Sequence, residues 1–265
     1  MDKVISKDGT TIAYDRSGQG PALIFVTGAV ANRSAVAPVA ARLARRFTVF
    51  AYDRRGRGDS GDTAPYAVER EIDDLNAIIQ AAGGSACVFG HSSGAVLALD
   101  AANRLPPPAI TNLAVYEPPI LVDNSRAPLP DNYVARLNEL VASGRRGEAV
   151  EYHLRTGIRI PEPFIAAMRQ QPIWAEMEAV APTLAYDGAI VAGVTTGQPL
   201  PKGQWSAVTI PTLVMNGGKS PAMMASGAQA LLAILPHAAH RLLPDQDHSV
   251  PAEVLAPVLV EFFLG

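Results

Sequence analysis

Residues 90–94 read Gly-His-Ser-Ser-Gly and place a serine between two glycines in the pattern G-x-S-x-G. The pattern follows an apolar run at 86–89 and precedes a stretch, 94–105, whose apolar residues recur at helical spacing. A serine in such a tight strand-to-helix turn can act as a nucleophile, because the helix start directs backbone N–H groups toward developing negative charge. The flanking glycines avoid collisions with the neighbouring strand and helix. We therefore predict that Ser92 is a nucleophile rather than part of a structural turn.

The elements that must position Ser92 are short apolar runs that alternate with amphipathic stretches. A hairpin is predicted at 3–18, around Lys-Asp-Gly. Buried strands are predicted at 21–28, 46–53, 85–90, 110–117, 212–217 and 238–245. Helices are predicted at 34–46, 68–84, 94–105, 222–236 and 250–265. Such alternation is typical of an α/β fold with a mostly parallel sheet.

The segment 121–205 departs from this alternation. It is rich in proline and holds helical patterns at 131–144 and 147–157, but it shows no clear strand. We interpret it as a helical insertion that covers the ends of the strands. The predicted domains are therefore an α/β core at 1–120 and 206–265 and a helical cap at 121–205.

Composition limits the classes of partner. The chain has 265 residues, of which 48% are hydrophobic, and its formal net charge of −3 leaves no basic excess for nucleic acid or an anionic membrane. The N-terminal segment is charged and no run approaches the roughly 20 apolar residues of a membrane span, so we expect a cytoplasmic protein. The single cysteine, Cys87, lies in an apolar run and indicates a core residue. We expect a small-molecule substrate, no metal, and a monomer or homodimer.

Three motifs, each after a predicted strand, together resemble the α/β-hydrolase family. They are Tyr-Asp-Arg-Arg-Gly-Arg-Gly-Asp-Ser at 52–60, Gly-His-Ser-Ser-Gly at 90–94 and Asp-Gln-Asp-His-Ser-Val at 245–250. Each motif is common alone, but their combination and order are specific and cover essentially the whole chain. The resemblance implies an α/β-hydrolase fold with an eight-stranded, mostly parallel sheet flanked by helices, and a helical cap insertion. It also implies a serine–acid–histidine triad in that chain order, an oxyanion hole and no cofactor.

The resemblance implies a catalytic histidine in the loop after the last strand, where this chain has His248. An imidazole with a pKa near 6.5 is suited to take the proton of a serine hydroxyl and to return it. Asp247 precedes it where many relatives have glycine, and we interpret Asp247 as a solvated loop residue. Of the other histidines, His91 lies inside the turn and is expected to point into the structure, and His153 lies in the insertion.

The resemblance also implies an oxyanion hole made of two backbone N–H groups. One belongs to Ser93, and the other belongs to Ala29 in the loop after the strand at 21–28. This chain has Thr27 where the family often has histidine. That difference removes a side chain that fixes the loop but leaves the backbone donor in place.

The acid of the triad departs most from the family pattern. Many relatives carry an aspartate in the loop after the seventh strand, where this chain has Ser220, and a serine cannot supply the negative charge that an imidazolium needs. Other relatives carry the acid at the end of the sixth strand, where this chain has Glu117. One helix and one strand separate Glu117 from Ser92, so the two are expected to be spatial neighbours. Glu117 is the predicted acid, and Asp123, Asp187 or no acid stay open as alternatives.

These residues predict a serine hydrolase that acts on an ester, thioester or lactone through an acyl-enzyme. A serine nucleophile disfavours the haloalkane and epoxide chemistries of the family, which use aspartate. We expect a small, largely apolar substrate in a pocket lined by the cap and by the loop after the seventh strand. The residues predicted for this pocket are Phe164, Met168, Trp174, Met177, Tyr186, Met223 and Met224.

Two other functions stay open. The first is a different enzyme on the same fold, such as a C–C bond hydrolase, a perhydrolase or a cyclase without a cofactor. The second is a non-catalytic receptor that binds a ligand in the capped pocket, an idea favoured by the missing aspartate.

Overall fold

The computed structural model describes all residues, 1–265, and contains one eight-stranded sheet. The strands are β1 (Asp2–Ile5), β2 (Thr11–Gly18), β3 (Ala22–Val26), β4 (Thr48–Tyr52), β5 (Ala86–His91), β6 (Ile110–Tyr116), β7 (Thr212–Gly217) and β8 (Ala238–Leu243). Their order is β1-β2-β4-β3-β5-β6-β7-β8, and β2 is antiparallel to both of its neighbours, β1 and β4. All other pairs are parallel. The predicted hairpin and mostly parallel sheet are therefore confirmed.

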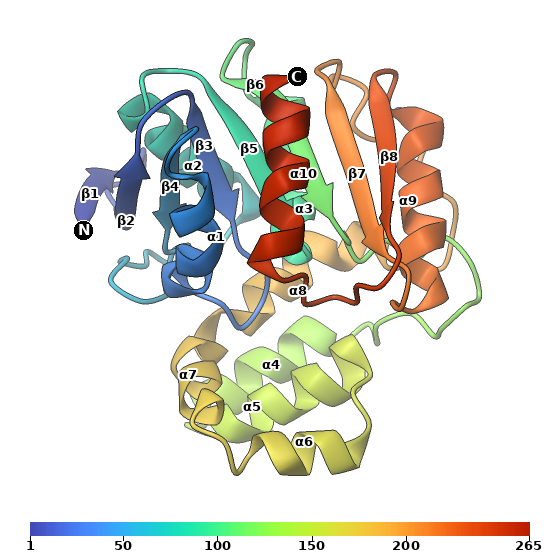
Figure 1. Ribbon diagram of the computed structural model, residues 1–265. Coiled ribbons are helices and arrows are strands. Elements are labelled where there is room, and N and C mark those ends of the chain that lie inside the picture. The colour runs from blue at the N-terminus through green and yellow to red at the C-terminus, as the bar shows by residue number, and fades with distance from the viewer.

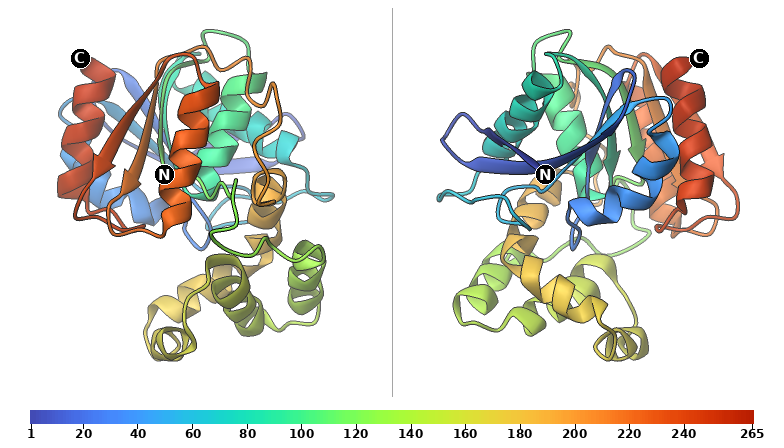
Figure 2. Two further views of the ribbon diagram at one scale, coloured as in Figure 1. Left: turned by 90° about the vertical axis from the view of Figure 1, so that its right-hand side faces the viewer. Right: turned by 60° about the vertical axis from the view of Figure 1, so that its left-hand side comes forward.

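Helices cover both faces of the sheet (Figures 1 and 2). They are α1 (Ala37–Leu43), α2 (Val68–Ala81), α3 (Ser93–Arg104), α9 (Ala222–Ile234) and α10 (Ala252–Leu264). Side chains alternate along each strand, so Val88 of β5 packs with α2, α3 and α9, whereas Phe89 packs with α1 and α10. Cys87 lies on the same face of the sheet as Phe89 and is buried, as expected.

The amphipathic pattern of α2 illustrates why these helices form. Ile72, Leu75, Ile78 and Ile79 recur on one face and are almost fully buried against the sheet. Acidic residues in the first turn complement the helix dipole. The helix ends before two glycines with positive φ. Local sequence and burial thus agree in the core.

No strand lies between β6 and β7, and the intervening chain is helical. Its helices are α4 (Tyr133–Ala142), α5 (Arg146–Tyr152), a π-helical turn (His153–Ile158), α6 (Glu162–Met168), α7 (Ile173–Val180) and α8 (Leu184–Val191). They lie beyond the carboxyl ends of the parallel strands (Figure 1). A separate hydrophobic cluster joins side chains between Tyr133 and Ala185.

The last part of the predicted insertion, from Ile190 to Trp205, packs with the α/β core. Ile190, Val191, Val194 and Trp205 pack in the main core cluster beside α2 and α3. Trp205 is nearly inaccessible, and its indole N–H donates to Asp100 at 2.7 Å. The separate cluster of the inserted helices therefore extends to Ala185, and the chain from Ile190 to Trp205 packs with the core. None of the helices is both long and apolar enough to traverse a bilayer.

Candidate active site

Ser92 occupies a strained turn between β5 and α3. Its backbone has φ 56° and ψ −126°, values that a non-glycine residue adopts rarely. The Ser92 N–H donates to the carbonyl of Tyr116 at 3.0 Å, which anchors the turn to β6. A Cβ on Gly90 would lie 2.6 Å from Ala95 Cα, and one on Gly94 would lie 2.3 Å from the Val26 carbonyl oxygen. These close approaches explain why both flanking positions are glycine.

Glu117 follows the last residue of β6 and is fully buried. Its backbone has φ 49°, and its N–H donates to the Met215 carbonyl at 3.0 Å. One carboxylate oxygen accepts the Gly217 N–H at 2.8 Å, and the other lies 2.7 Å from His248 Nδ1. Burial opposes ionisation of this carboxyl, but the hydrogen bonds from His248 and its other neighbours outweigh it and lower the pKa of Glu117.

Two side chains hold the loop that carries His248. His91 Nε2 lies 3.0 Å from the His248 carbonyl oxygen, and the two imidazole centroids are 4.6 Å apart. The Tyr116 hydroxyl donates to the carbonyl of Asp247. Burial, together with the charge of His248, lowers the pKa of His91 to about 3, so His91 stays neutral near pH 7. His91 thus points inward as expected, but its contact with the His248 loop was not predicted.

The Asp247 side chain is bonded within its own loop. It is exposed and accepts the N–H of Ser249 at 2.8 Å, which forms a local turn. Ser220 is half-buried, and its hydroxyl oxygen is inaccessible and has no partner with hydrogen-bond geometry. It nevertheless lies close enough to Glu117 to help lower the pKa of that carboxyl. Neither residue replaces Glu117 as the partner of His248.

The two predicted oxyanion donors belong to elements that border Ser92. Ser93 is the first residue of α3, so its N–H has no acceptor within the helix. Ala29 lies in the loop after β3, and the preceding Gly28 packs so closely against Ser92 that a Cβ there would lie 2.8 Å from Ser92 Cβ. The structure thus brings the loop of Ala29 and the start of α3 to the same side chain.

A cavity of about 560 Å³ lies between α1, α10 and the loops that carry Ala29 and His248. Most of its lining residues are hydrophobic, and its floor includes Phe25 and Phe89 of the sheet. His91 and His248 form part of its wall. This space therefore reaches the histidine side of the site from the face of the sheet that α1 and α10 cover.

None of the residues predicted for a pocket lines this cavity. Met177 and Met223 are buried, Met177 in the cluster of the inserted helices. Tyr186 stacks on Tyr66 with centroids 3.8 Å apart. Trp174 donates its indole N–H to Glu178 at 2.9 Å.

Phe164 and Met168 line a separate hollow of about 470 Å³ on the inserted helices. Phe164 is 64% exposed there. Apolar type alone did not separate the residues around the cavity from those of the helical cluster, because both use the same side chains. The structure thus places the predicted pocket residues in the inserted helices and in α9, outside the lining of the cavity that reaches His248.

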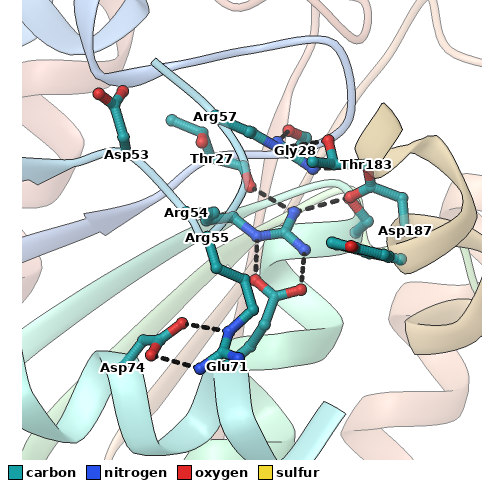
Figure 3. A network of polar contacts seen from close by, with 12 residues as sticks. Thr27, Gly28, Asp53, Arg54, Arg55, Arg57, Glu71, Asp74, Thr183 and Asp187 are labelled. Atoms are coloured by element: carbon teal, nitrogen blue, oxygen red, sulfur yellow. Dashed lines mark hydrogen bonds and ion pairs between the residues drawn. The ribbon is translucent and has the colours of Figure 1, made fainter. Parts of the chain in front are cut away.

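A buried network of arginines and carboxylates joins the core to α8 (Figure 3). The arginines Arg54 and Arg57 belong to the 52–60 motif, and both pair with Asp187 of α8. Asp187 was one of the alternatives for the triad acid, but its partners are these arginines and the hydroxyl of Ser93. Asp123, the other alternative, accepts the N–H of Ser125 in a local turn. In the sequence, the signal for this network is the run of arginines after β4, which lies within the 52–60 motif.

No group of three or more histidine, cysteine, aspartate or glutamate side chains converges in a way that could hold a metal ion.

Comparison with known proteins gives a consistent assignment. Residues 23–258 match the model of the alpha/beta hydrolase family. A crystal structure of an alpha/beta hydrolase from Sphaerobacter thermophilus is 54% identical and superposes with a TM-score of 0.92, covering 99% of this chain and 100% of the other.

Two curated proteins are more distant relatives. The 2-(acetamidomethylene)succinate hydrolase of Mesorhizobium japonicum is 28% identical over 247 residues, which are 91% of this chain and 86% of that protein. An uncharacterized hydrolase of Bacillus subtilis, YraK, is 37% identical over 102 residues, which are 37% of this chain and only 38% of that protein. The match of the family model over most of the sequence, together with the sheet topology, shows that the chain belongs to the alpha/beta hydrolase family.

Proposed function

We propose that the protein is a serine hydrolase that cleaves a carboxylic ester, thioester or lactone through an acyl-enzyme. The observation that carries this proposal is the 2.7 Å contact between His248 Nδ1 and the buried Glu117 carboxylate. Glu117 directly follows Tyr116, whose carbonyl accepts the N–H of Ser92 in its strained strand-to-helix turn. Three features support these roles. Ser92 lies in the turn before a helix start, Glu117 orients the His248 ring through Nδ1, and the Glu117 carboxylate is ionised.

In the proposed acylation, Ser92 Oγ attacks the carbonyl carbon of the substrate while His248 Nε2 takes the hydroxyl proton. The carbonyl oxygen becomes an oxyanion, which the N–H groups of Ala29 and Ser93 stabilise. The C–O or C–S bond then breaks, and the imidazolium returns the proton to the leaving group. Water repeats the same sequence on the acyl-enzyme and releases the acid and free Ser92.

Glu117 contributes electrostatically in both halves of this cycle. The imidazolium that forms on His248 lies within hydrogen-bond distance of a carboxylate that is already ionised, because hydrogen bonds hold its pKa down despite burial. The same contact fixes the ring with Nδ1 toward Glu117 and leaves Nε2 for Ser92. His91 is neutral near pH 7 and does not compete as a base.

The proposed substrate has a small, largely apolar group. The cavity of about 560 Å³ beside His248 supports this proposal, because most of the residues that line it are hydrophobic. Hydrolysis rather than ligand binding alone is supported by the relative named 2-(acetamidomethylene)succinate hydrolase, which aligns over 91% of this chain.

Covalent labelling tests the proposal. The purified protein is incubated with a fluorophosphonate, which phosphonylates activated serines, and the modified peptide is identified by mass spectrometry. We expect labelling at Ser92, parallel loss of p-nitrophenyl acetate turnover, and no labelling of the Ser92→Ala variant. Absence of both labelling and turnover in the wild-type protein would favour the receptor. Turnover that needs hydrogen peroxide would favour a perhydrolase.

A further inference from the structure

Asp187 of α8 contacts both Arg54 and Arg57 in the buried network of Figure 3. Its Oδ1 accepts hydrogen bonds from Arg54 Nη1 and from the Ser93 hydroxyl, both at 2.7 Å. Its Oδ2 accepts from Arg57 Nη2 at 2.6 Å. A carboxylate of the inserted helices therefore contacts the residue that directly follows the nucleophile.

The two arginines extend this contact to the loop after β3. Arg54 Nη1 also donates to the carbonyl of Thr27 at 3.2 Å. Arg57 Nη1 donates to the carbonyls of Gly28 at 2.6 Å and Ala31 at 3.0 Å. These three carbonyls bracket Ala29, whose N–H is one of the two proposed oxyanion donors. The network thus touches both elements that carry the donors.

The network is buried and electrically balanced. The side chains of Arg54, Arg57 and Asp187 are each at most 3% exposed. Arg54 also makes a bidentate pair with the buried Glu71, with both contacts at 2.7 Å. Two guanidinium groups therefore face two carboxylates. Burial raises the pKa of Asp187, but Arg57, Arg54 and Ser93 outweigh it and keep the pKa low, so the carboxylate stays ionised.

We propose that Asp187 is a positioning residue that aligns both oxyanion donors, Ser93 directly and Ala29 through Arg54 and Arg57. This inference rests on the proposed acyl-transfer function. Backbone donors act only when they lie within about 3 Å of the developing oxyanion, and a displacement of about 1 Å can lower a rate by about 10²-fold. A balanced set of charged hydrogen bonds holds such a geometry without adding net charge beside the reacting carbonyl.

The proposal predicts a loss of transition-state binding that exceeds any loss of substrate binding. Ser93→Ala removes the contact with Asp187 but keeps the Ser93 N–H and both arginine pairs. We expect it to lower kcat about tenfold and to weaken inhibition by phenylboronic acid, a mimic of the tetrahedral state, by a similar factor. KM for p-nitrophenyl acetate is expected to change less than threefold. Asp187→Asn should lower kcat about 100-fold with the same parallel loss of boronic acid affinity.

Asp74→Asn provides a matched control for lost stability. Asp74 makes a bidentate contact at 2.7 Å with the buried Arg55, close to the network in Figure 3, but neither residue contacts the loop after β3. This variant removes the same charge from a similar ion pair. We expect a lower melting temperature with kcat and boronic acid affinity within threefold of the wild type.

The outcomes separate this inference from the proposed function. If Ser93→Ala and Asp187→Asn lose only thermal stability, as Asp74→Asn does, while the wild-type protein turns over esters, then Asp187 is a structural anchor and the inference is wrong. A wild-type protein that neither hydrolyses p-nitrophenyl acetate nor binds phenylboronic acid would instead contradict the proposed function. Ser93→Ala keeps this test decisive even if Asp187→Asn does not fold.

Discussion

Glu117 and Asp187 are both buried carboxylates near Ser92, but their partners differ. Glu117 pairs with one histidine and one backbone N–H, whereas Asp187 pairs with two arginines and a hydroxyl. Arginine is permanently charged, so the Asp187 carboxylate is already neutralised and cannot stabilise an additional positive charge that forms during a reaction. Histidine gains its charge only when it takes a proton. The identity of the partner, rather than burial or pKa direction, therefore separates a carboxylate suited to catalysis from one suited to positioning.

The largest expected effect is on the pair Ser92 and His248, whose histidine contacts Glu117. Ser92→Ala and His248→Ala should each lower kcat by roughly 10⁴- to 10⁶-fold, and the double variant should be little worse than either, because the two residues act as a unit. Steady-state kinetics with p-nitrophenyl acetate measure this. Additive losses in the double variant, or unchanged turnover in purified Ser92→Ala, would contradict the assignment.

The next effect compares the two candidate acid positions. Glu117→Gln keeps the shape but removes the charge, so it should lower kcat by about 10²- to 10⁴-fold, while Ser220→Ala should cost less than about tenfold. Adding Ser220→Asp to Glu117→Gln should restore part of the activity, since it returns a carboxylate from the neighbouring loop. The reverse ranking of the two single variants would reassign the acid.

The loss of folding stability should be larger for a carboxylate of the arginine network than for Glu117. Glu71→Gln leaves the buried Arg54 with a single carboxylate partner, so it should lower the free energy of unfolding by about 3–5 kcal/mol. Glu117→Gln should lower it less, because the partner His248 can be neutral and the His248 side chain is 37% exposed. Urea unfolding of both variants measures the difference. Equal losses would show that the two carboxylates have the same structural weight.

A smaller effect is expected on substrate preference. Val39 of α1 lines the cavity beside His248, so Val39→Phe should lower kcat/KM for p-nitrophenyl octanoate about tenfold relative to the acetate. Ala41→Trp is the control, because Ala41 is exposed on the same helix and lies outside the cavity. An unchanged ratio of the two esters in Val39→Phe would place the acyl group elsewhere.

The smallest effect is a dependence of stability on pH near the arginine network. Burial lowers the pKa of His153 from 6.5 to about 4, with Asp187 opposing and Arg57 reinforcing the shift. The unfolded chain binds this proton below about pH 6.5 and the folded chain only near pH 4, so stability is complete above pH 6.5 and declines as pH falls between these values.

His153→Gln should therefore flatten the decline of melting temperature between pH 7 and pH 4. His237→Gln is the control, since His237 is exposed, and it should leave the wild-type profile unchanged. Profiles of equal slope in His153→Gln and the wild type would contradict the shifted pKa of His153.

Much of the fold followed from local patterns. Each predicted strand after the hairpin appears within about two residues of its expected bounds, because burial on both faces demands continuous apolar runs. The strand-to-helix turn at Ser92 could also be predicted from sequence, since close backbone contacts require glycine at positions 90 and 94. The predicted pocket residues did not gather around the cavity beside His248, because an apolar side chain in a helix indicates burial without saying against what.

Sequence alone was enough to identify the family, the candidate nucleophile and base, and a carboxylate that directly follows β6, because each lies in a short motif next to a strand. Only the tertiary structure decided which carboxylate meets which cation. Glu117 reaches His248 across 131 residues and Arg57 reaches Asp187 across 130, so no local pattern records either contact. Charged groups are sorted by distance and burial in the folded chain, and these depend on how α8 and the last loop pack over the sheet.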